Sequence, residues 1–253
     1  MGARHGRGRS LSLLPPGRID SEAVYDGRVI RLGVDTVRFP DGTEGQLEMI
    51  RHVGASAVLP FVGGLFDPNP EVLLVREYRY ASDGYLYEIP AGLPEGLEES
   101  REECAHRELE EETGMRATSV TLLTSIYTTP GFTDEVIRLF VATNLEPGEP
   151  SRDQDQFIEV VRVAFSEALE MVRDGRIVDA KSVVAILYVD RFVRGDWGGK
   201  EPASGRICPP AGIRRPQSET VGSAKKAGNG LVWHVAEWHG TCFGSRTGRV
   251  STP

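Results

Sequence analysis

The chain has 253 residues, and its apolar fraction of 40% and charged fraction of 26% are those of a globular protein. It contains no run of eighteen apolar residues, which excludes a membrane-spanning helix of the usual length. The net charge is −8 although residues 1–18 carry four arginines and no acid, so the middle of the chain is strongly acidic and argues against nucleic acid as a partner.

The first elements predicted along the chain are β-strands. Residues 24–39 and 46–52 alternate apolar and polar side chains, and the Asp41-Gly42 pair between them is a hairpin signal. Residues 55–62 and 71–78 form two further apolar runs across the loop "GGLFDPNP", and a short strand that follows stops at Pro90. We therefore predict an N-terminal strand module at residues 21–53, after an unordered basic segment at residues 1–20.

The second half mixes helices and strands. Residues 99–113 form a predicted helix that ends at Gly114, and strands are predicted at 117–127, 135–143 and 157–165. A helix with Ser166 as N-cap and a longer helix over residues 179–194 follow. This order predicts an α+β fold with a mixed sheet at residues 54–196. Residues 197–253, rich in Pro, Gly and Ser, are predicted to be a disordered tail.

The segment "RELEEETGM", residues 107–115, carries the most informative charges. On a helix Glu108 and Glu112 lie one above the other with Glu111 beside them, so the three carboxylates repel one another. A hard divalent cation such as Mg²⁺ would turn this repulsion into attraction, and Arg107 can orient one carboxylate through an ion pair. A solvated, Glu-rich surface helix is the alternative interpretation.

The loop before the helix decides between these interpretations. Residues 88–115, "EIPAGLPEGLEESREECAHRELEEETGM", resemble the Nudix box G-x5-E-x7-R-E-U-x-E-E-x-G-U, where U is apolar. The half from Arg107 to Met115 matches throughout, whereas the other half is one residue longer. Counting back from Arg107 selects Glu99, and counting forward from Gly92 selects Glu98, so both stay open as the brace of the loop.

The flanking segments "VLLVREYRY" and "TPGFTDEVIRLFVATNL" are similar to ADP-ribose pyrophosphatases of the Nudix superfamily, and Pro130 stands where these typically carry a proline. The similarity covers roughly residues 24–194. It implies a Nudix α/β/α sandwich with a mixed sheet, often a homodimer whose N-terminal strands are exchanged or packed between protomers. It also implies Mg²⁺-dependent hydrolysis of ADP-ribose to AMP and ribose 5-phosphate, with Mn²⁺ as the alternative cofactor.

The sequence is also compatible with two alternative functions. A nucleotide-sugar diphosphatase acting on UDP-glucose or GDP-mannose would use the same box, because the box handles only the shared diphosphate. A non-catalytic Nudix-fold nucleotide-binding regulator is the other alternative. The intact Glu108, Glu111 and Glu112 favour an enzyme, since a binding module need not retain three repelling carboxylates.

The resemblance also assigns site residues. Glu108, Glu112 and Glu111, with the main-chain carbonyl of Ala91, are the expected metal ligands. Arg79 is the candidate for a diphosphate contact, although a solvated strand arginine is the alternative, and Arg51 and Glu88 are further substrate-binding candidates.

The general base is predicted from what the acidic loops offer. Gln154 and Gln156 stand where some relatives have glutamates, and an amide cannot accept a proton from water. This favours Glu135 as the base, followed by Glu111 and then Glu159. The three cysteines form no C-x-x-C pair, which favours a reducing, cytoplasmic location.

Overall fold

The computed structural model describes residues 16–96, 98–148 and 158–195 of the chain. Strands β1 (Gly17–Asp26), β2 (Ile30–Arg38) and β3 (Glu44–His52) form an antiparallel sheet in the order β1-β2-β3. Gly42 has a φ of 86° in the turn between β2 and β3, as the hairpin signal predicts. Because β1 begins at Gly17, residues 17–20 belong to this sheet and not to the unordered segment predicted for residues 1–20.

A second, mixed sheet follows. Its strands run in the order β10-β5-β4-β9-β8, where β4 and β9 are parallel and the other neighbours on this path are antiparallel. Short β6 pairs with β5, and the two-residue β7 pairs with β4. The strands are β4 (Ala55–Val62), β5 (Glu71–Arg79), β6 (Gly84–Glu88), β7 (Ala91–Gly92), β8 (Met115–Tyr127), β9 (Val136–Pro147) and β10 (Ile158–Ala164).

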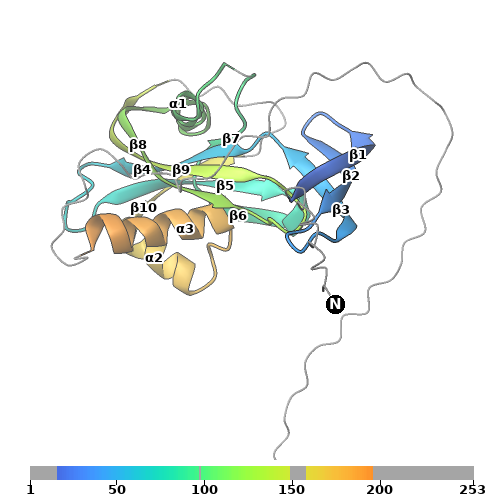
Figure 1. Cartoon of the computed structure of the whole chain (residues 1–253). Helices are drawn as coiled ribbons and strands as arrows, with labels where there is room; N and C mark the ends of the chain where they lie inside the picture. The colour runs from blue at the N-terminus through green and yellow to red at the C-terminus, as the bar shows by residue number, and fades with distance from the viewer. Residues whose placement is uncertain (1–15, 97, 149–157, 196–253) are drawn as a thin grey trace, which may run out of the picture. The chain divides into compact units, whose positions relative to one another are not determined.

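Helices cover both faces of the mixed sheet (Figure 1). One face carries α1 (Arg101–Thr113), and the other carries α2 (Phe165–Arg173) and α3 (Ala180–Tyr188), which continues as a π-helix over Val189–Arg194. Strand β4 shows why the layers form: Val58 packs with the α1 residues, whereas Leu59 and Phe61 pack with those of α2 and α3. Alternate side chains of a strand point to opposite faces, so a continuous apolar strand is buried on both sides. The predicted α+β fold and α/β/α sandwich are confirmed.

The start of α2 differs from the prediction. Ala164, and not Ser166, is the N-cap residue, and it makes no side-chain capping bond. The N–H groups at the start of α2 find partners on the loop between β4 and β5: Phe165 N–H donates to the Pro70 carbonyl at 2.7 Å, and Ser166 N–H donates to Asn69 Oδ1 at 3.2 Å. Capping from a distant loop removes the need for a local serine cap.

The N-terminal sheet is attached to the mixed-sheet unit through β3. Ile50 N–H donates to the Phe132 carbonyl at 2.7 Å, and Asp134 N–H donates to the Ile50 carbonyl at 3.2 Å. No helix within the described ranges is long and apolar enough to cross a membrane. The predicted tail at residues 197–253 lies outside the described residues.

Candidate active site

Helix α1 carries the predicted metal-binding carboxylates. It begins with a capping box, in which Ser100 Oγ accepts from Glu103 N–H at 3.1 Å and the Glu103 carboxylate accepts from Ser100 N–H at 2.8 Å. It ends at Gly114, whose φ of 71° closes the helix in the left-handed conformation. Ala105 and Leu109 pack this helix on the sheet, and Glu108 and Glu112 are buried with them, at 7% and 2% exposure.

Strand β7 brings main chain against these carboxylates. Ala91 and Gly92 pair with Ala57 and Ser56 of β4, which holds this short strand under α1. The Ala91 backbone N–H donates a hydrogen bond to the Glu112 carboxylate. A Cβ on Gly92 would overlap the Glu108 carboxylate, so a larger residue would push this carboxylate out of its present position. The predicted ligands Ala91, Glu108 and Glu112 therefore lie together.

Arg107 connects the carboxylates to the box loop. Its Nη1 donates to Glu108 Oε1 at 2.8 Å and to Glu111 Oε2 at 2.9 Å. On the other side, Nε donates to Glu99 Oε1 at 2.8 Å, and Nη2 donates to the Leu93 carbonyl at 2.8 Å. The hydrogen bond to Glu99 is the main cause that raises the pKa of the guanidinium. The predicted orienting role of Arg107 thus extends to several carboxylates and to the loop.

Burial makes the inner carboxylates costly to ionise. It raises the pKa of Glu108 to about 7, although the Arg107 charge and hydrogen bond oppose the shift. Burial, followed by the neighbouring Glu108 charge, also raises the pKa of Glu112 well above its usual value. A nearby cation would remove this cost, which makes the face chemically suited to a divalent metal.

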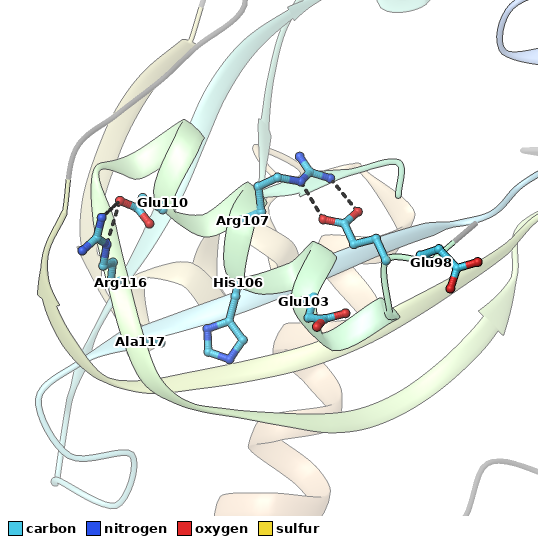
Figure 2. Close-up of a pocket in the computed structure, with 8 residues that line it drawn as sticks. Glu98, Glu103, His106, Arg107, Glu110, Arg116 and Ala117 are labelled. Atoms are coloured by element: carbon cyan, nitrogen blue, oxygen red, sulfur yellow. Dashed lines mark hydrogen bonds and ion pairs between the residues drawn. The ribbon is translucent and has the colours of Figure 1, made fainter. Parts of the chain in front are cut away.

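Glu99 occupies the upstream position of the box. It pairs with Arg107, and its Oε2 also accepts from Glu95 N–H at 2.6 Å, which folds the loop back on itself. Glu98, by contrast, lies on the outer side of the loop (Figure 2). The extra loop residue is therefore accommodated before Glu99, and the spacing counted back from Arg107 is the one that the structure follows.

This arrangement predicts a pH-dependent difference between two neighbouring variants. The hydrogen bond with Arg107 outweighs the opposing effect of burial and, together with the Glu95 backbone N–H, lowers the pKa of Glu99 below 4.5. A lowered pKa contributes stability that is present above the unfolded value and is lost as pH falls through the folded value. Glu99→Gln should lower the melting temperature at pH 7, and the difference from wild type should shrink as pH falls below about 4.5. Glu98→Gln is the matched control, and an equal loss in both variants would contradict the assignment.

A second charged group lies at the end of β5. Arg79 donates from Nε and Nη2 to both oxygens of Glu88, each at 2.8 Å, and Nη2 also pairs with Glu77 Oε2 at 2.8 Å. Its charge acts on Glu112, which places this group beside the α1 carboxylates. Glu88 is 2% exposed and also pairs with Lys181 of α3. Arg79 and Glu88, both predicted substrate residues, are thus in direct contact.

Sequence reasoning did not single out Glu77 or Lys181. Both are buried, at 7% and 8% exposure, and both belong to the group around Glu88 and Arg79. A signal was present in each case, since each is a charged residue inside an apolar stretch, "VLLVREY" and "AKSVVAILY". Charged side chains at such positions are buried only when they are paired.

Arg51 and Glu135 lie in a different group, between β3 and the start of β9. Arg51 pairs with Asp35 and, at 3.2 Å, with Asp134. Glu135 accepts from Thr128 Oγ1 at 2.8 Å and lies 3.2 Å from His52 Nδ1. None of these contacts reaches the carboxylates of α1. Glu159, the third candidate base, pairs with Arg76 at 3.4 Å, and Gln154 and Gln156 lie outside the described residues.

The outer side of α1 borders an open groove of about 640 Å³ (Figure 2). Glu110, which sequence reasoning treated as simply solvated, pairs here with Arg116 at 2.6 Å. The inward-facing Glu108 and Glu112 do not line this groove, so we place the candidate active site on the opposite, inner side of the helix. The lining residues are Glu98, Glu99, Glu103, His106, Arg107, Glu110, Arg116 and Ala117.

The NUDIX domain family model matches residues 58–216, which include all of this site. The chain belongs to the Nudix family. It is 39% identical over 173 residues to an ADP-ribose pyrophosphatase of Bacillus subtilis and 38% identical over 173 residues to a methanol dehydrogenase activator of Bacillus methanolicus. Each alignment covers 68% of this chain and 90% of the relative.

Two further comparisons agree with this family. A GDP-mannose pyrophosphatase of Yersinia enterocolitica is 38% identical over 130 residues, which is 48% of this chain and 67% of the relative. A solved ADP compounds hydrolase superposes with a TM-score of 0.62 at 26% identity and covers 74% of this chain and 99% of that protein. The chain is therefore a Nudix hydrolase, as the box and its flanking segments predict.

Proposed function

We propose that this Nudix hydrolase cleaves the diphosphate of ADP-ribose with water, giving AMP and ribose 5-phosphate. The observation that carries the proposal is the buried carboxylate face of α1 beside Arg79. The substrate follows from the relatives: the ADP-ribose pyrophosphatase aligns over 173 residues, whereas the GDP-mannose pyrophosphatase aligns over 130. GDP-mannose and UDP-glucose remain the second substrate class, because the box contacts only the shared diphosphate.

The residues of the site fit a divalent cation, which we propose is Mg²⁺ or Mn²⁺. The carboxylates of Glu108, Glu111 and Glu112 and the Ala91 carbonyl are the oxygen donors that these ions prefer. Glu112 has other interactions, yet its buried Oε2 atom makes no hydrogen bond. Within the described ranges no three acidic, His or Cys side chains already gather as a metal cluster. Arg107 holds Glu108 and Glu111, so both would exchange this partner for the metal.

The chemistry then divides between the bound ion and the chain. A divalent cation at these oxygens supplies charge neutralisation at the diphosphate and lowers the pKa of water. Arg79 uses Nε and Nη2 on Glu88 and Glu77, which leaves Nη1 for a phosphate oxygen. The chain thus contributes mainly position and charge, which is what phosphoryl chemistry requires.

Glu111 and Glu135 are the two proposed bases for the attacking water. Glu111 lies on the same helix as the proposed ligands, and its side chain is 32% exposed, so water can reach it. Glu135 contacts Thr128 and His52, in the separate group between β3 and the start of β9. The contacts therefore favour Glu111 over Glu135, which reverses the order that the sequence suggested.

One assay tests the function. The protein is incubated with ADP-ribose, GDP-mannose, UDP-glucose and ATP, with Mg²⁺ or with EDTA, and the released mononucleotide is quantified. We expect turnover that requires the metal and is fastest on ADP-ribose. Faster turnover of a nucleotide sugar would move the protein to the second substrate class. Binding without turnover of any of these compounds would support the non-catalytic regulator.

We further propose a homodimer that uses the N-terminal sheet. Every residue of β1 is exposed in the single chain, including the apolar Ile19, Val24 and Tyr25. An outer strand with exposed apolar side chains is a common site of association between chains. A solution mass of about 28 kDa by light scattering, that of the 27.7 kDa monomer, would contradict the proposal.

We place the protein in the cytoplasm. Cys104 is a free, buried thiol, and its burial raises its pKa to about 11, so the thiol stays protonated and inert. Such a cysteine is compatible with a reducing compartment. Recovery of the protein in a secreted fraction would contradict this location.

A further inference from the structure

Lys181 is a buried lysine that the proposed chemistry does not use. It lies in the first turn of α3 and is 8% exposed. Its Nζ donates to Glu88 Oε2 and, at 3.0 Å, to Asp179 Oδ2. Asp179 is also the N-cap of α3, since its carboxylate accepts from Ser182 N–H at 3.0 Å. A buried ammonium group held by two carboxylates has a fixed position.

The same turn of α3 is fastened to the end of β6. Ser182 Oγ accepts from Ile89 N–H at 2.8 Å, and Ile89 is the residue that follows Glu88. The backbone and the carboxylate at this point are therefore both held from α3. Movement of the end of β6 relative to α3 would therefore break two contacts, the ion pair between Glu88 and Lys181 and the hydrogen bond between Ile89 and Ser182.

Glu88 passes this constraint to Arg79. Its two oxygens each accept one hydrogen bond from the guanidinium at 2.8 Å, which fixes the plane of Arg79. Burial alone would raise the pKa of Glu88, but Arg79 and Lys181 together lower it, so the carboxylate stays charged between its two cations. Without Lys181, Glu88 would lose one of the two cations that hold it, and its carboxylate would be free to shift together with the guanidinium that it orients.

From these contacts we infer that Lys181 is a positioning residue, which acts through Glu88 to hold the Arg79 guanidinium in place for the substrate diphosphate. The inference rests on the proposed function, because it takes the diphosphate as the group that Arg79 binds. The inference also gives a reason for the buried charges of Lys181 and Glu88. Apolar residues of similar volume can replace a buried ion pair without loss of stability, so stability alone does not require these two charges.

A double-mutant cycle tests the inference. The dissociation constant of ADP-ribose is measured in EDTA, where no turnover occurs, for wild type, Lys181→Met, Arg79→Met and the double variant. Lys181→Met should weaken binding by about tenfold, the size of one charge-assisted hydrogen bond. In the Arg79→Met background, Lys181→Met should cause no further loss, because its effect passes through Arg79. With metal, KM should rise by a similar factor and kcat should change less.

Controls separate positioning from folding. Lys181→Arg keeps the charge and should recover part of the affinity, whereas Arg162→Met removes an exposed cation that pairs with Glu71 and should change nothing. If Lys181→Met does not fold, Glu88→Gln gives the same cycle with an isosteric neutral side chain. Additive losses in the cycle, or an unchanged dissociation constant in a folded Lys181→Met, would overturn the inference.

The outcome for the proposed function is read separately. Absence of metal-dependent turnover of ADP-ribose by the wild-type protein would overturn that function. The same cycle is then measured with inorganic pyrophosphate, which carries the diphosphate chemistry alone. If the effects of Lys181→Met and Arg79→Met on the dissociation constant of pyrophosphate are not additive, the positioning role is supported. Additive effects would overturn it.

Discussion

Replacing Glu112 with glutamine is expected to abolish metal-dependent turnover while leaving the metal-free protein at least as stable as the wild type. Glutamine keeps the shape but cannot supply an anionic oxygen, so we expect a loss of about a thousandfold, the effect of removing a group that stabilises charge in the transition state. Burial raises the pKa of Glu112, so its carboxyl group costs stability once pH rises above the ordinary glutamate value, at which the unfolded chain ionises. The amide removes this cost.

Two measurements check this prediction: the Mg²⁺-dependent rate on ADP-ribose, and the melting temperature in EDTA at pH 8. Glu110→Gln is the matched control on the same helix, because Glu110 pairs with the exposed Arg116 on the outer side. It should retain its rate. Full activity in Glu112→Gln would remove Glu112 from the metal site, and a large fall in melting temperature would show that its carboxylate stabilises the metal-free fold.

The parts of this molecule that local sequence predicts well are those whose partners are close in the chain. Helix α1 is the clearest case, since its capping box and the closing Gly114 lie within the helix and at its ends. The burial of Glu108 and Glu112 on one face follows from their spacing of four residues. The Nudix box is recognisable for the same reason, because its residues are contiguous.

Contacts between distant segments could not be read in this way. The choice between Glu98 and Glu99 depended on which carboxylate reaches Arg107 across a loop, and two counts of the same spacing disagreed. The cap of α2 comes from Asn69, which is 97 residues away from its partner Ser166. The pairing of Lys181 with Glu88 spans 93 residues. Tertiary partners of this kind override local capping and burial rules.

Arg51 shows a further limit. An arginine near a diphosphate site is a reasonable phosphate ligand by its chemistry, and the sequence predicts it as one. In the single chain Arg51 is held between Asp35 and Asp134, whose two charges exceed its own. Arg79 is paired in the same way, with Glu77 and Glu88, so these pairings do not decide between the two arginines and Arg51 stays a predicted substrate contact.

Arg107 should show the second large effect, in which activity and metal affinity change in opposite directions. Arg107→Met removes the partly buried cation shared by Glu99, Glu108 and Glu111, and the loss of its hydrogen bonds to these charged groups costs about 2 kcal/mol of metal-free stability. The carboxylates then lack their cation, so Mg²⁺ no longer competes with the guanidinium. Added Mg²⁺ should raise the melting temperature of the variant more than that of the wild type.

Turnover should nevertheless fall by about a hundredfold, because Arg107 also holds the Leu93 carbonyl and so fixes the box loop, and small displacements in a reacting geometry cost this much. Arg116→Met, which removes an exposed partner of Glu110, is the matched control and should change neither quantity. If stability, Mg²⁺ response and turnover all fall together, Arg107 serves only to fold the helix against its loop. We expect turnover to fall and Mg²⁺ affinity to rise because, in the metal-free protein, the Arg107 guanidinium pairs with the same carboxylates that would bind the metal.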